Sequence, residues 1–457
     1  MDYRIMHDSM GEVKVPKDKY WGAQTQRSYE NFAIGTETMP ESLIYALSVI
    51  KLASARVNNK LKNDKMTDEK LRAIETVIIG DILNGELLYT EFPLSVWQTG
   101  SGTQTNMNVN EVIANRANEL LKKDLIHPND DINMSQSSND VFPSAMHISA
   151  VLELAEVITE LKVLINSFKK LESQNKKVVK SGRTHLQDAT PISFSQEISG
   201  WRSSLEKDLE LILEARKHLL SLAIGGTAVG TGLNAPKGFD VAVCEELYAI
   251  TGYKFKPAKN KFHALTSKDE MVYAHGALKA LAVDLMKIAN DIKWLASGPR
   301  CGLGEISIPE NEPGSSIMPG KVNPTQCEAI SMIAVEVLGN DTTISFSASQ
   351  GNFELNVFMP VIIYNFVQSA ILLADGMYSF TENCVKGIKA NKKKMKENLT
   401  NSLMLVTALS PYIGYEKCAK IAKLAHQKNL SLKEATLSLG YLTEEEFDKY
   451  FHPEEMI

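Results

Sequence analysis

Residues 268–297 read KDEMVYAHGALKALAVDLMKIANDIKWLAS, and this stretch decides the fold class. Its apolar residues recur three and four positions apart, which is the period of an α-helix. They cover more than one narrow stripe of the helix surface, whereas a helix that lies on a single core needs only one apolar face. At 1.5 Å per residue, such a helix spans about 45 Å. A helix this long and this apolar predicts an α-helical bundle.

Four other stretches carry apolar residues at the same spacing. They cover residues 149–174, 193–222, 325–348 and 356–385, and the first contains neither Gly nor Pro. One chain has too few helices to cover every apolar face, so we expect further copies of the chain to cover the rest. The pattern predicts an all-α protein with a central long-helix bundle that assembles as a homo-oligomer.

Composition excludes several classes of protein. The 457 residues carry 49 Lys+Arg against 55 Asp+Glu, and the resulting net charge of −6 argues against a nucleic-acid binder. Hydrophobic residues make up 44% and charged residues 23%, as in ordinary globular proteins, which excludes a disordered or collagen-like chain. Because one hydrophobic core stops growing beyond about 250–300 residues, we expect more than one domain.

The cysteines and the N-terminus bear on the cellular compartment. The five cysteines are widely separated, odd in number and without the spacing of a zinc site, which favours a reducing compartment and no bound metal. Residues 1–8 show neither an apolar signal region nor an Arg-rich presequence. The chain has no uninterrupted run of about 18 apolar residues. We therefore expect a soluble, cytoplasmic protein with no membrane contact.

Changes in pattern along the chain suggest three domains. Residues 1–138 form an N-terminal, mixed but mainly helical domain, residues 139–391 the central long-helix bundle, and residues 392–457 a small C-terminal helical domain. A DNA-binding helix-turn-helix within 416–450 is an alternative. The C-terminal domain carries 10 Lys+Arg against 9 Asp+Glu, which is not the charge pattern of a DNA-binding surface.

The N-terminal domain combines two kinds of element. Residues 41–62 and 68–84 have helical spacing, and short strand pieces are expected around 3–5 and 12–14. The domain therefore resembles a cap beside the bundle.

The connection at 301–324 contains four Gly and four Pro, and a connection this long inside a helical bundle generally has a function. Its segment 314–321 is not a nucleotide P-loop, because five residues separate its glycines and Val322 replaces the Ser or Thr that would bind Mg²⁺. The glycine-rich segment 225–232 follows a helix instead of a strand, which argues against dinucleotide binding. We expect no cofactor at either place.

The end of this connection can be interpreted in two ways. Asn323, followed by Pro324 and Gln326, has the pattern of a helix start with a capping box, and Glu328 could merely complement the helix dipole. Lys321 does not fit that interpretation. A cation ahead of a helix N-terminus does nothing for the helix but strengthens an anion site there.

Two further helix starts are rich in Ser, Thr and Asn. Residues 99–108 open a helix that ends near Lys123, and residues 133–140 open another, with Pro143 in its first turn. Capping is the favoured interpretation of either start alone. Together with Lys321, these starts suit a small carboxylate ligand gripped by hydrogen-bond donors.

His185 stands out among the nine histidines. It lies in a segment, 181–191, that we expect to be a loop, between turn-forming and hydrogen-bonding residues. Imidazole transfers protons near neutral pH, so His185 is a candidate acid or base. The alternative is an exposed surface histidine without a function.

The stretch GSSIMPGKVNP at 314–324 resembles the signature of the fumarase/aspartase superfamily, whose members release fumarate by elimination. Residues 99–110, 127–130, 135–140 and 182–191 resemble the superfamily's other blocks in the same order. Within the superfamily the chain is most similar to the class II fumarases, which are metal-free.

Local features favour this family over its relatives. Aspartate ammonia-lyases have Gln where His185 stands and Ala where Gly320 stands, and the sequence from Thr325 to Glu328 is typical of fumarases. Val141 departs from the Thr that is common in the family. Two alternatives remain: an aspartate ammonia-lyase or another fumarate-releasing lyase, and a non-catalytic structural protein with the same fold, as in lens crystallins.

The resemblance implies the following fold and function. The fold is a three-domain, all-α fumarase/aspartase chain, and four copies form a homotetramer with 222 symmetry around a twenty-helix core. Each active site takes loops from three subunits. The activity is the reversible anti addition of water to fumarate, a small dicarboxylate, giving L-malate through an aci-carboxylate in the tricarboxylic acid cycle, without metal or cofactor.

The resemblance also assigns roles to residues. His185, Ser315, Glu328 and Lys321 are the catalytic residues: Ser315 takes the C3 proton, His185 with Glu328 exchanges a proton with the leaving hydroxide or water, and Lys321 stabilises charge. The following residues bind substrate: Ser101, Gly102, Thr103, Ser137, Ser138, Asn139, Thr184, Ser316, Lys321, Val322 and Asn323. A second anion site is formed by His127, Pro128, Asn129 and Asp130.

Overall fold

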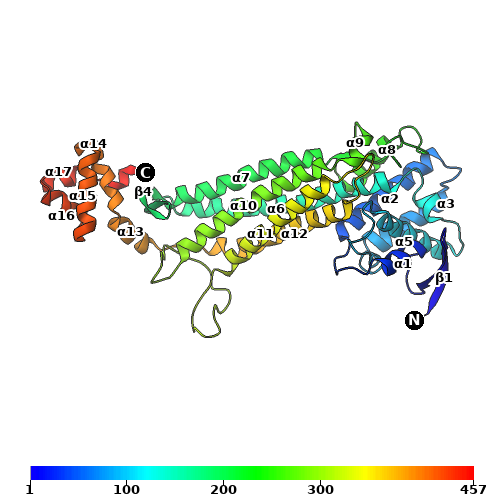
Figure 1. Ribbon diagram of the computed structural model, residues 1–457, viewed down its shortest axis with the longest axis horizontal. Helices are drawn as coiled ribbons and strands as arrows, with labels where there is room; N and C mark the ends of the chain where they lie inside the picture. Colours follow the sequence, from blue (N-terminus) through cyan, green and yellow to red (C-terminus); the bar gives the residue numbers. More distant parts are fainter. Residues whose placement is uncertain (1) are drawn as a thin grey trace. The chain divides into compact units, whose positions relative to one another are not determined.

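A computed structural model describes residues 2–457, and its architecture is helical as predicted. Five helices of the described chain have 24 residues or more, and Figure 1 labels each of them. They are α6 (Ser138–Gln174), α7 (Phe194–His218), α10 (Asp269–Ala296), α11 (Thr325–Ala348) and α12 (Met359–Asn383). The strands of the described chain form four separate two-stranded sheets, so sheet plays only a local role. The predicted all-α fold class is confirmed.

The predicted long helices occur with small shifts at their ends. Only α6 differs substantially, because it begins at Ser138 and joins the predicted helix start at 133–140 to the periodic stretch at 149–174. Pro143 lies within the first turns of α6. Val141 N already bonds Ser137 O at 3.1 Å, so a residue at position 143 would normally donate to the carbonyl of Asn139, and the proline gives up this one helical bond.

Backbone contacts divide the chain into two compact units, each built from three separate segments. Unit 1 comprises Met1–Thr159, Glu210–Ala282 and Val335–Ala374, and unit 2 comprises Glu160–Leu209, Val283–Ala334 and Asp375–Ile457. The boundaries fall within the long helices. This division concerns contacts, and the three-domain assignment from the sequence stays a prediction.

Unit 1 contains most of the short N-terminal elements. Its hairpin strands and helices confirm the expected strand pieces and the helices at 41–62 and 68–84. The elements are β1 (Tyr3–Asp8), β2 (Gly11–Pro16), α1 (Ala23–Asn31), α2 (Glu41–Leu61), α3 (Asp68–Glu75), η1 (Thr76–Leu83), α4 (Leu87–Thr90), α5 (Thr103–Leu121), η2 (Pro128–Ile132), β5 (Ser221–Leu222), α8 (Phe239–Thr251), β6 (Lys256–Pro257) and α9 (Lys261–Thr266).

A buried polar cluster joins three long helices inside unit 1. His275 of α10 is fully buried, with Nδ1 3.0 Å from Asp341 Oδ1 of α11 and Nε2 2.9 Å from Ser369 Oγ of α12. Lys279 also bonds Asp341, at 2.6 Å. Buried polar groups are stable only when they are paired, so these contacts fix how the three helices pack.

Unit 2 has an aromatic core between α6 and α7. Trp201 lies 5.9 Å from Phe168 and 6.3 Å from Phe194 between ring centroids, in edge-on arrangements. Its indole N–H donates to Asp291 Oδ2 of α10 at 2.9 Å. A buried tryptophan needs such a partner for its polar edge.

Short elements complete unit 2. They are β3 (Val179–Thr184), β4 (Gln187–Ser193), β7 (Ile306–Ser307), η3 (Val385–Gly387), β8 (Lys389–Ala390), α13 (Lys392–Asn401), η4 (Leu403–Leu409), α14 (Ser410–Ile413), α15 (Tyr415–Lys428), α16 (Leu432–Ser438), α17 (Glu444–Tyr450) and η5 (Pro453–Met456). The short C-terminal helices were predicted, and Ser431 and Thr443 start two of them with capping boxes.

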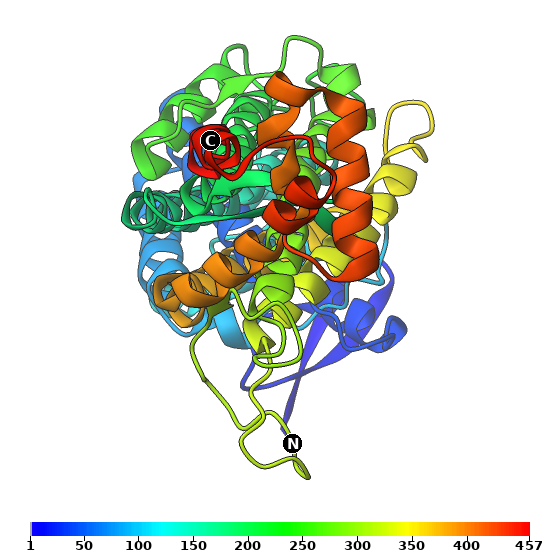
Figure 2. The ribbon, with the colours of Figure 1, turned by 90° about the vertical axis from the view of Figure 1, so that its left-hand side faces the viewer.

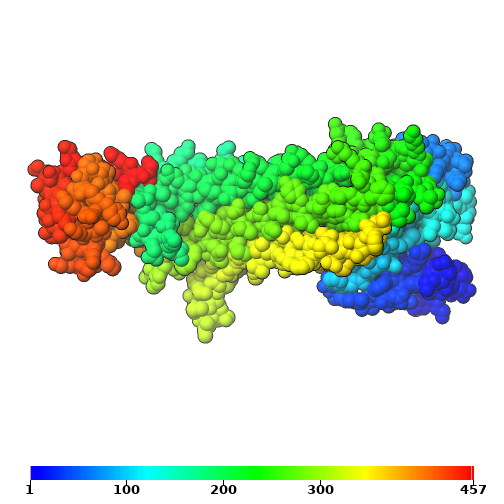
Figure 3. Space-filling view, turned by 45° about the horizontal axis from the view of Figure 1, so that its top comes forward, coloured from blue at the N-terminus to red at the C-terminus, as the bar shows by residue number. Residues whose placement is uncertain are grey.

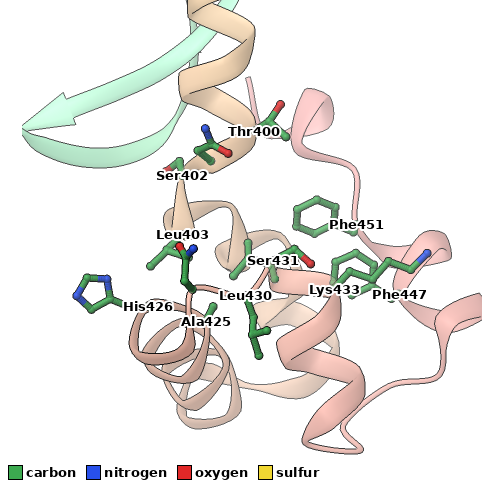
Figure 4. A pocket seen from close by; sticks show the side chains of 13 residues that line it. Thr400, Ser402, Leu403, Ala425, His426, Leu430, Ser431, Lys433, Phe447 and Phe451 are labelled. Carbon is green, nitrogen blue, oxygen red and sulfur yellow. The ribbon is translucent and has the colours of Figure 1, made fainter. Parts of the chain in front are cut away.

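The C-terminal helices enclose a hollow of about 600 Å³. Figure 4 shows its lining, in which Lys433 lies near the rings of Phe447 and Phe451, while His426 lies on the opposite side. The two rings are stacked, with centroids 4.7 Å apart. None of the candidate site residues from the sequence lines this hollow.

One apolar helix bears on the expectation that no segment spans a membrane. By length and composition alone, Met359–Gly387 is apolar enough to cross a bilayer, although it lacks an uninterrupted apolar run. About 56% of its most apolar window is buried within the protein. Its apolar character is also that of a core helix, which must be apolar on several sides.

A buried carboxyl in unit 2 predicts pH-dependent stability. Burial raises the pKa of Asp208 on α7 to about 7, helped by the nearby carboxylate of Asp284 on α10. Because this folded-state pKa exceeds the unfolded value, Asp208 favours the folded state at low pH, and that stability is lost as the pH rises through about 7. Asp208→Asn should therefore raise the unfolding temperature at about pH 8 and change it less at about pH 5.

The matched control is Asp124→Asn, at an exposed aspartate. Thermal unfolding monitored by circular dichroism at the two pH values measures the effect. Equal shifts for Asp208→Asn at both would contradict the assignment.

Candidate active site

The first candidate loop precedes α5 in unit 1. Gly102 has a φ of +70°, and a Cβ at this position would lie 2.2 Å from the ring of Phe142. Any other residue would be strained and would displace the ring. Gly102 therefore sets the path of the chain between its two neighbours, the candidate substrate-binding residues Ser101 and Thr103.

Ser101 and Thr103 do not cap α5, although capping was the favoured interpretation of this loop alone. The N-cap residue makes no side-chain cap bond, and Gln98 Oε1 accepts the hydrogen bond from Thr105 N at 3.1 Å. Ser101 Oγ lies 2.9 Å from Thr103 Oγ1. The two hydroxyls form a pair that a ligand could use.

In the second candidate loop, Ser137 caps the helix and its neighbours make other contacts. Ser137 Oγ accepts from Asn139 N at 3.3 Å, and Ser137 N donates to Asp140 Oδ1 at 2.8 Å, so Ser137 caps α6. Ser138 Oγ instead accepts from Asn106 Nδ2 of α5, at 3.0 Å. This bond brings the two candidate loops of unit 1 together. Asn139 Nδ2 donates to Ala228 O at 2.8 Å.

Two buried charged groups that the sequence analysis missed support this loop. Burial raises the pKa of Asp140, although Ser137 N and Gly225 N donate to it at 2.8 Å. Lys51 of α2 is 1% exposed, and burial lowers its pKa to about 7. A lone lysine inside the apolar run LSVIKLASA was the signal available in the sequence.

The proposed second anion site is a π-helical turn, η2. His127 Nδ1 accepts from the backbone N–H groups of Asn129 and Asp130, at 3.3 and 3.2 Å. Pro128 begins the turn. The His127 side chain is exposed, and Asp131 beside it is paired with Lys70 at 2.6 Å. The backbone donors of this turn are thus already engaged by the imidazole.

His185 lies on a hairpin, so the expectation of a loop at 181–191 was wrong. Strands β3 and β4 pair antiparallel, and Thr184 is opposite Gln187 across a turn made by His185 and Leu186. Both turn residues have positive φ, 57° and 60°. Such turns normally use Asn-Gly, which explains why the sequence contains no hairpin signal. The turn exposes the His185 side chain.

Buried ion pairs hold this hairpin in unit 2. Arg183 bonds both carboxylate oxygens of the fully buried Glu305, at 3.1 and 2.6 Å, and Lys180 Nζ lies 3.3 Å from the same group. Burial would raise the pKa of Glu305, but the bonds from Arg183 and the charge of Lys180 hold it below its usual value. The clamp fixes β3 against residues 301–307, and no sequence motif indicated it.

The signature loop projects away from the helices in both Figures 1 and 2. Gly314 N donates to Lys321 O at 2.7 Å, and a Cβ at Gly314 would lie 2.4 Å from that oxygen, so only glycine permits this closure. Inside the loop, Ser315 Oγ accepts from the N–H groups of Ile317 and Met318, at 3.2 and 3.0 Å. Two amide donors therefore point at the serine oxygen.

The capping box considered for α11 is not formed. Asn323 Nδ2 donates to Gly314 O at 2.8 Å, and Gln326 Oε1 accepts from Ser379 Oγ at 2.8 Å. Glu328 is exposed in the first turn of α11. Asn323 thus braces the signature loop and is not the cap of the helix.

The candidate residues fall into groups. In unit 1, one polar hollow of about 720 Å³ is lined by Ser137 with Asn129 and Asp130. In unit 2, His185 lines a hollow of about 590 Å³ beside Trp201. Ser315, Lys321 and Val322 line a third hollow of about 410 Å³. The other candidate residues line none of these three hollows: Ser101, Gly102, Thr103, His127, Pro128, Ser138, Asn139, Thr184, Ser316, Asn323 and Glu328. None of these three hollows collects the whole predicted set.

One cluster could in principle hold a metal ion. Over residues 2–457, ligand atoms of His263, Asp269 and Glu270 lie within 4.8 Å of one another, near the start of α10. The His263 and Asp269 side chains are exposed, and the cluster includes none of the candidate site residues. It therefore gives no reason to assign a metal to them.

Comparison with known proteins identifies the family. Residues 11–339 match the Lyase family, and residues 405–457 match the Fumarase C C-terminus family. Class II fumarate hydratases of Helicobacter pylori (strain ATCC 700392 / 26695) and Bacillus subtilis (strain 168) are 62% and 61% identical to the chain, and each alignment covers 100% of the chain and 99% of the relative.

A solved structure agrees with this assignment. The recombinant class II fumarase of Schistosoma mansoni matches with a TM-score of 0.95 and 44% identity, over 100% of this chain and 99% of that one. Family membership confirms the resemblance seen in the signature and in the other motif blocks. The chain belongs to the class II fumarate hydratase family of lyases.

Proposed function

We propose that the chain is a cytoplasmic fumarate hydratase, which adds water reversibly to fumarate to give L-malate in the tricarboxylic acid cycle. The observation that carries this proposal is the identity of about 60% over the whole chain to class II fumarate hydratases. The reaction also sets a requirement on the site. Removal of a proton next to a carboxylate creates an aci-carboxylate, so the site must stabilise developing negative charge with fixed donors.

We assign substrate binding mainly to hydrogen-bond donors near helix starts that do not cap the helix. The hydroxyl pair Ser101 and Thr103 and the hydroxyl of Ser138 support the binding of one carboxylate in unit 1. Gly102, which separates Ser101 from Thr103, and Ser137 and Asn139, which flank Ser138, are proposed to complete this binding site. In unit 2, Thr184, Ser316, Lys321, Val322 and Asn323 are proposed to bind the reacting carboxylate.

Ser315 is the proposed base for the C3 proton. A serine hydroxyl is a weak base unless its oxygen is ionised, and an alkoxide needs nearby donors. The amides of Ile317 and Met318 already donate to Ser315 Oγ, which supports this role. The ammonium of Lys321, at the other end of the loop closure, adds a positive charge.

His185 and Glu328 are proposed to act together as the second acid and base, which serves the hydroxyl group. The imidazole protonates the departing hydroxide, and in reverse it accepts a proton from water. Both side chains are exposed in the single chain, which is consistent with their pairing between subunits. The turn at 127–130 is proposed as a second anion site.

The exposed face of α11 supports a homotetramer whose active sites are shared between three subunits. Met332, Val335 and Phe346 are 68%, 62% and 69% exposed, and the yellow surface in Figure 3 includes α11 and α12. Apolar side chains that recur on one helix face normally meet a partner. Glu328 lies on the same face, since 3.6 residues per turn places these four positions within about 60° of arc.

Substrate choice is the direct test of the proposed function. The purified protein should form fumarate from L-malate and not from L-aspartate, as followed by the ultraviolet absorbance of fumarate. Turnover of aspartate alone would favour the ammonia-lyase alternative. A folded protein that converts neither compound would favour the non-catalytic alternative.

The role of His185 predicts a specific loss. His185→Asn should lower kcat for L-malate by at least about a hundredfold, the usual contribution of a general acid or base, while the unfolding temperature stays unchanged. The matched control is His218→Asn, at an exposed histidine near the end of α7, which should retain activity. Wild-type turnover by His185→Asn would remove this residue from the mechanism.

The α11 face predicts the effect of a charge on assembly. Met332→Lys should shift the molecular mass in sedimentation from a tetramer to smaller species and abolish turnover, because a buried unpaired charge disrupts an apolar interface. Met10→Lys is the control, since Met10 is 80% exposed and lies between β1 and β2. An unchanged mass for Met332→Lys would contradict the proposed interface.

A further inference from the structure

Lys51 is buried beneath the second candidate loop, where the charge of Asp140 acts on it without a direct ion pair. It lies in the middle of α2 and is 1% exposed, and no carboxylate of the described residues lies within 4.0 Å of its Nζ. Among the described residues, its Nζ donates to two side-chain amides, Asn133 Oδ1 at 2.9 Å and Gln136 Oε1 at 3.0 Å. Burial lowers the pKa of Lys51 more than the charge of Asp140 raises it, so the buried ammonium is unfavourable and stability does not explain this lysine.

An ammonium group can only donate hydrogen bonds, so it fixes the direction of its neighbours. The oxygens of Asn133 and Gln136 must face Lys51, which turns the amide nitrogen of Asn133 toward Gln136 O, at 3.3 Å. The same Asn133 Oδ1 also accepts from Asn106 Nδ2, at 3.2 Å, and from Asn110 Nδ2, at 3.3 Å. By orienting this amide, Lys51 leaves Asn133 Oδ1 as the acceptor for the amides of Asn106 and Asn110.

The orientation of the Asn133 amide also affects Ser138. Asn106 is fully buried, and its Nδ2 faces both Asn133 Oδ1 and Ser138 Oγ, the latter at 3.0 Å. Ser138 Oγ is therefore an acceptor toward Asn106, and its own proton is left to point elsewhere. That proton is the donor that a substrate carboxylate would require.

The loop also has anchors that do not involve Lys51. Asn58 Nδ2 donates to Met134 O at 3.0 Å, and Ser135 Oγ donates to Asn58 Oδ1 at 2.8 Å. Asp140 holds Ser137 N from the other side. Loss of Lys51 would leave these anchors in place and would change mainly the orientation of the amides.

We propose that Lys51 is a positioning residue, whose ammonium sets the direction of a hydrogen-bond relay from Asn133 through Asn106 to Ser138, so that the Ser138 hydroxyl donates to the substrate carboxylate. This inference rests on the proposed binding of a dicarboxylate. It adds to that function a residue that does not touch the substrate and that no motif contains.

The first test is Lys51→Met, which keeps the length and the burial but removes the donor. KM for L-malate should rise about tenfold, the scale of one hydrogen bond to a charged group, with a smaller change in kcat. The matched control is Lys268→Met. Lys268 is equally buried in unit 1 but donates only to the carbonyls of Ala264, Leu265 and Ser267. Its loss should leave KM within about twofold of the wild-type value.

A double-mutant cycle separates the relay from a general structural effect. If Lys51 acts through Ser138, Lys51→Met should change kcat/KM by less than about twofold in a Ser138→Ala background. That background lacks the hydroxyl that the relay orients. Additive losses would overturn the proposal, as would a wild-type KM for a folded Lys51→Met variant.

A second variant tests the direction of the relay if Lys51→Met does not fold. Asn106→Asp is isosteric but replaces the donor to Ser138 with an acceptor, so the hydroxyl should turn toward the introduced carboxylate and KM should rise at least as much as for Asn106→Ala. A lower KM than for Asn106→Ala would overturn the relay. If the wild-type protein converts no malate, the proposed function fails, and the dissociation constant for fumarate, measured by calorimetry, replaces KM in every comparison.

Discussion

Buried charge holds both groups of candidate site residues in place. In unit 1, Lys51 and Asp140 lie beneath the loop that carries Ser138. In unit 2, Arg183 and Lys180 enclose Glu305 at the base of the hairpin that carries His185. Breaking a buried ion pair leaves an uncompensated charge, which costs about 3–5 kcal/mol, so the hairpin is strongly fixed. In each unit, the buried charges lie beneath the candidate residues that they support.

The long helices could be predicted because their signal is local and repeated. Each apolar residue in 268–297 reports the same period, and α10 occupies almost the same range. The hairpin around His185 could not be predicted, since its two turn residues are not the Asn and Gly that mark such turns. Its strands are stabilised by Glu305, more than a hundred residues away, and such a contact leaves no local pattern in the sequence.

For the candidate site, too, the sequence indicated some residues and not others. Motif residues such as Ser101, Ser138 and Lys321 could be proposed as candidates because they cluster at helix starts and match a family pattern. The residues beneath them could not, because Lys51 and Glu305 each act through a partner distant in the sequence. Capping also needed the structure: Ser137 caps α6, whereas Ser101, which has a similar local sequence, does not cap α5.

On the proposed tetramer, α11 couples assembly to catalysis. The helix begins directly after the signature loop, which carries Ser315, and its exposed face carries Glu328 in the first turn and Met332 and Val335 one and two turns later. Burial of those apolar side chains against another subunit would also remove water from around Glu328. A carboxylate in a drier place interacts more strongly with an imidazole partner, because a lower dielectric constant strengthens their attraction. The same contact that completes the assembly would therefore strengthen the acid–base pair.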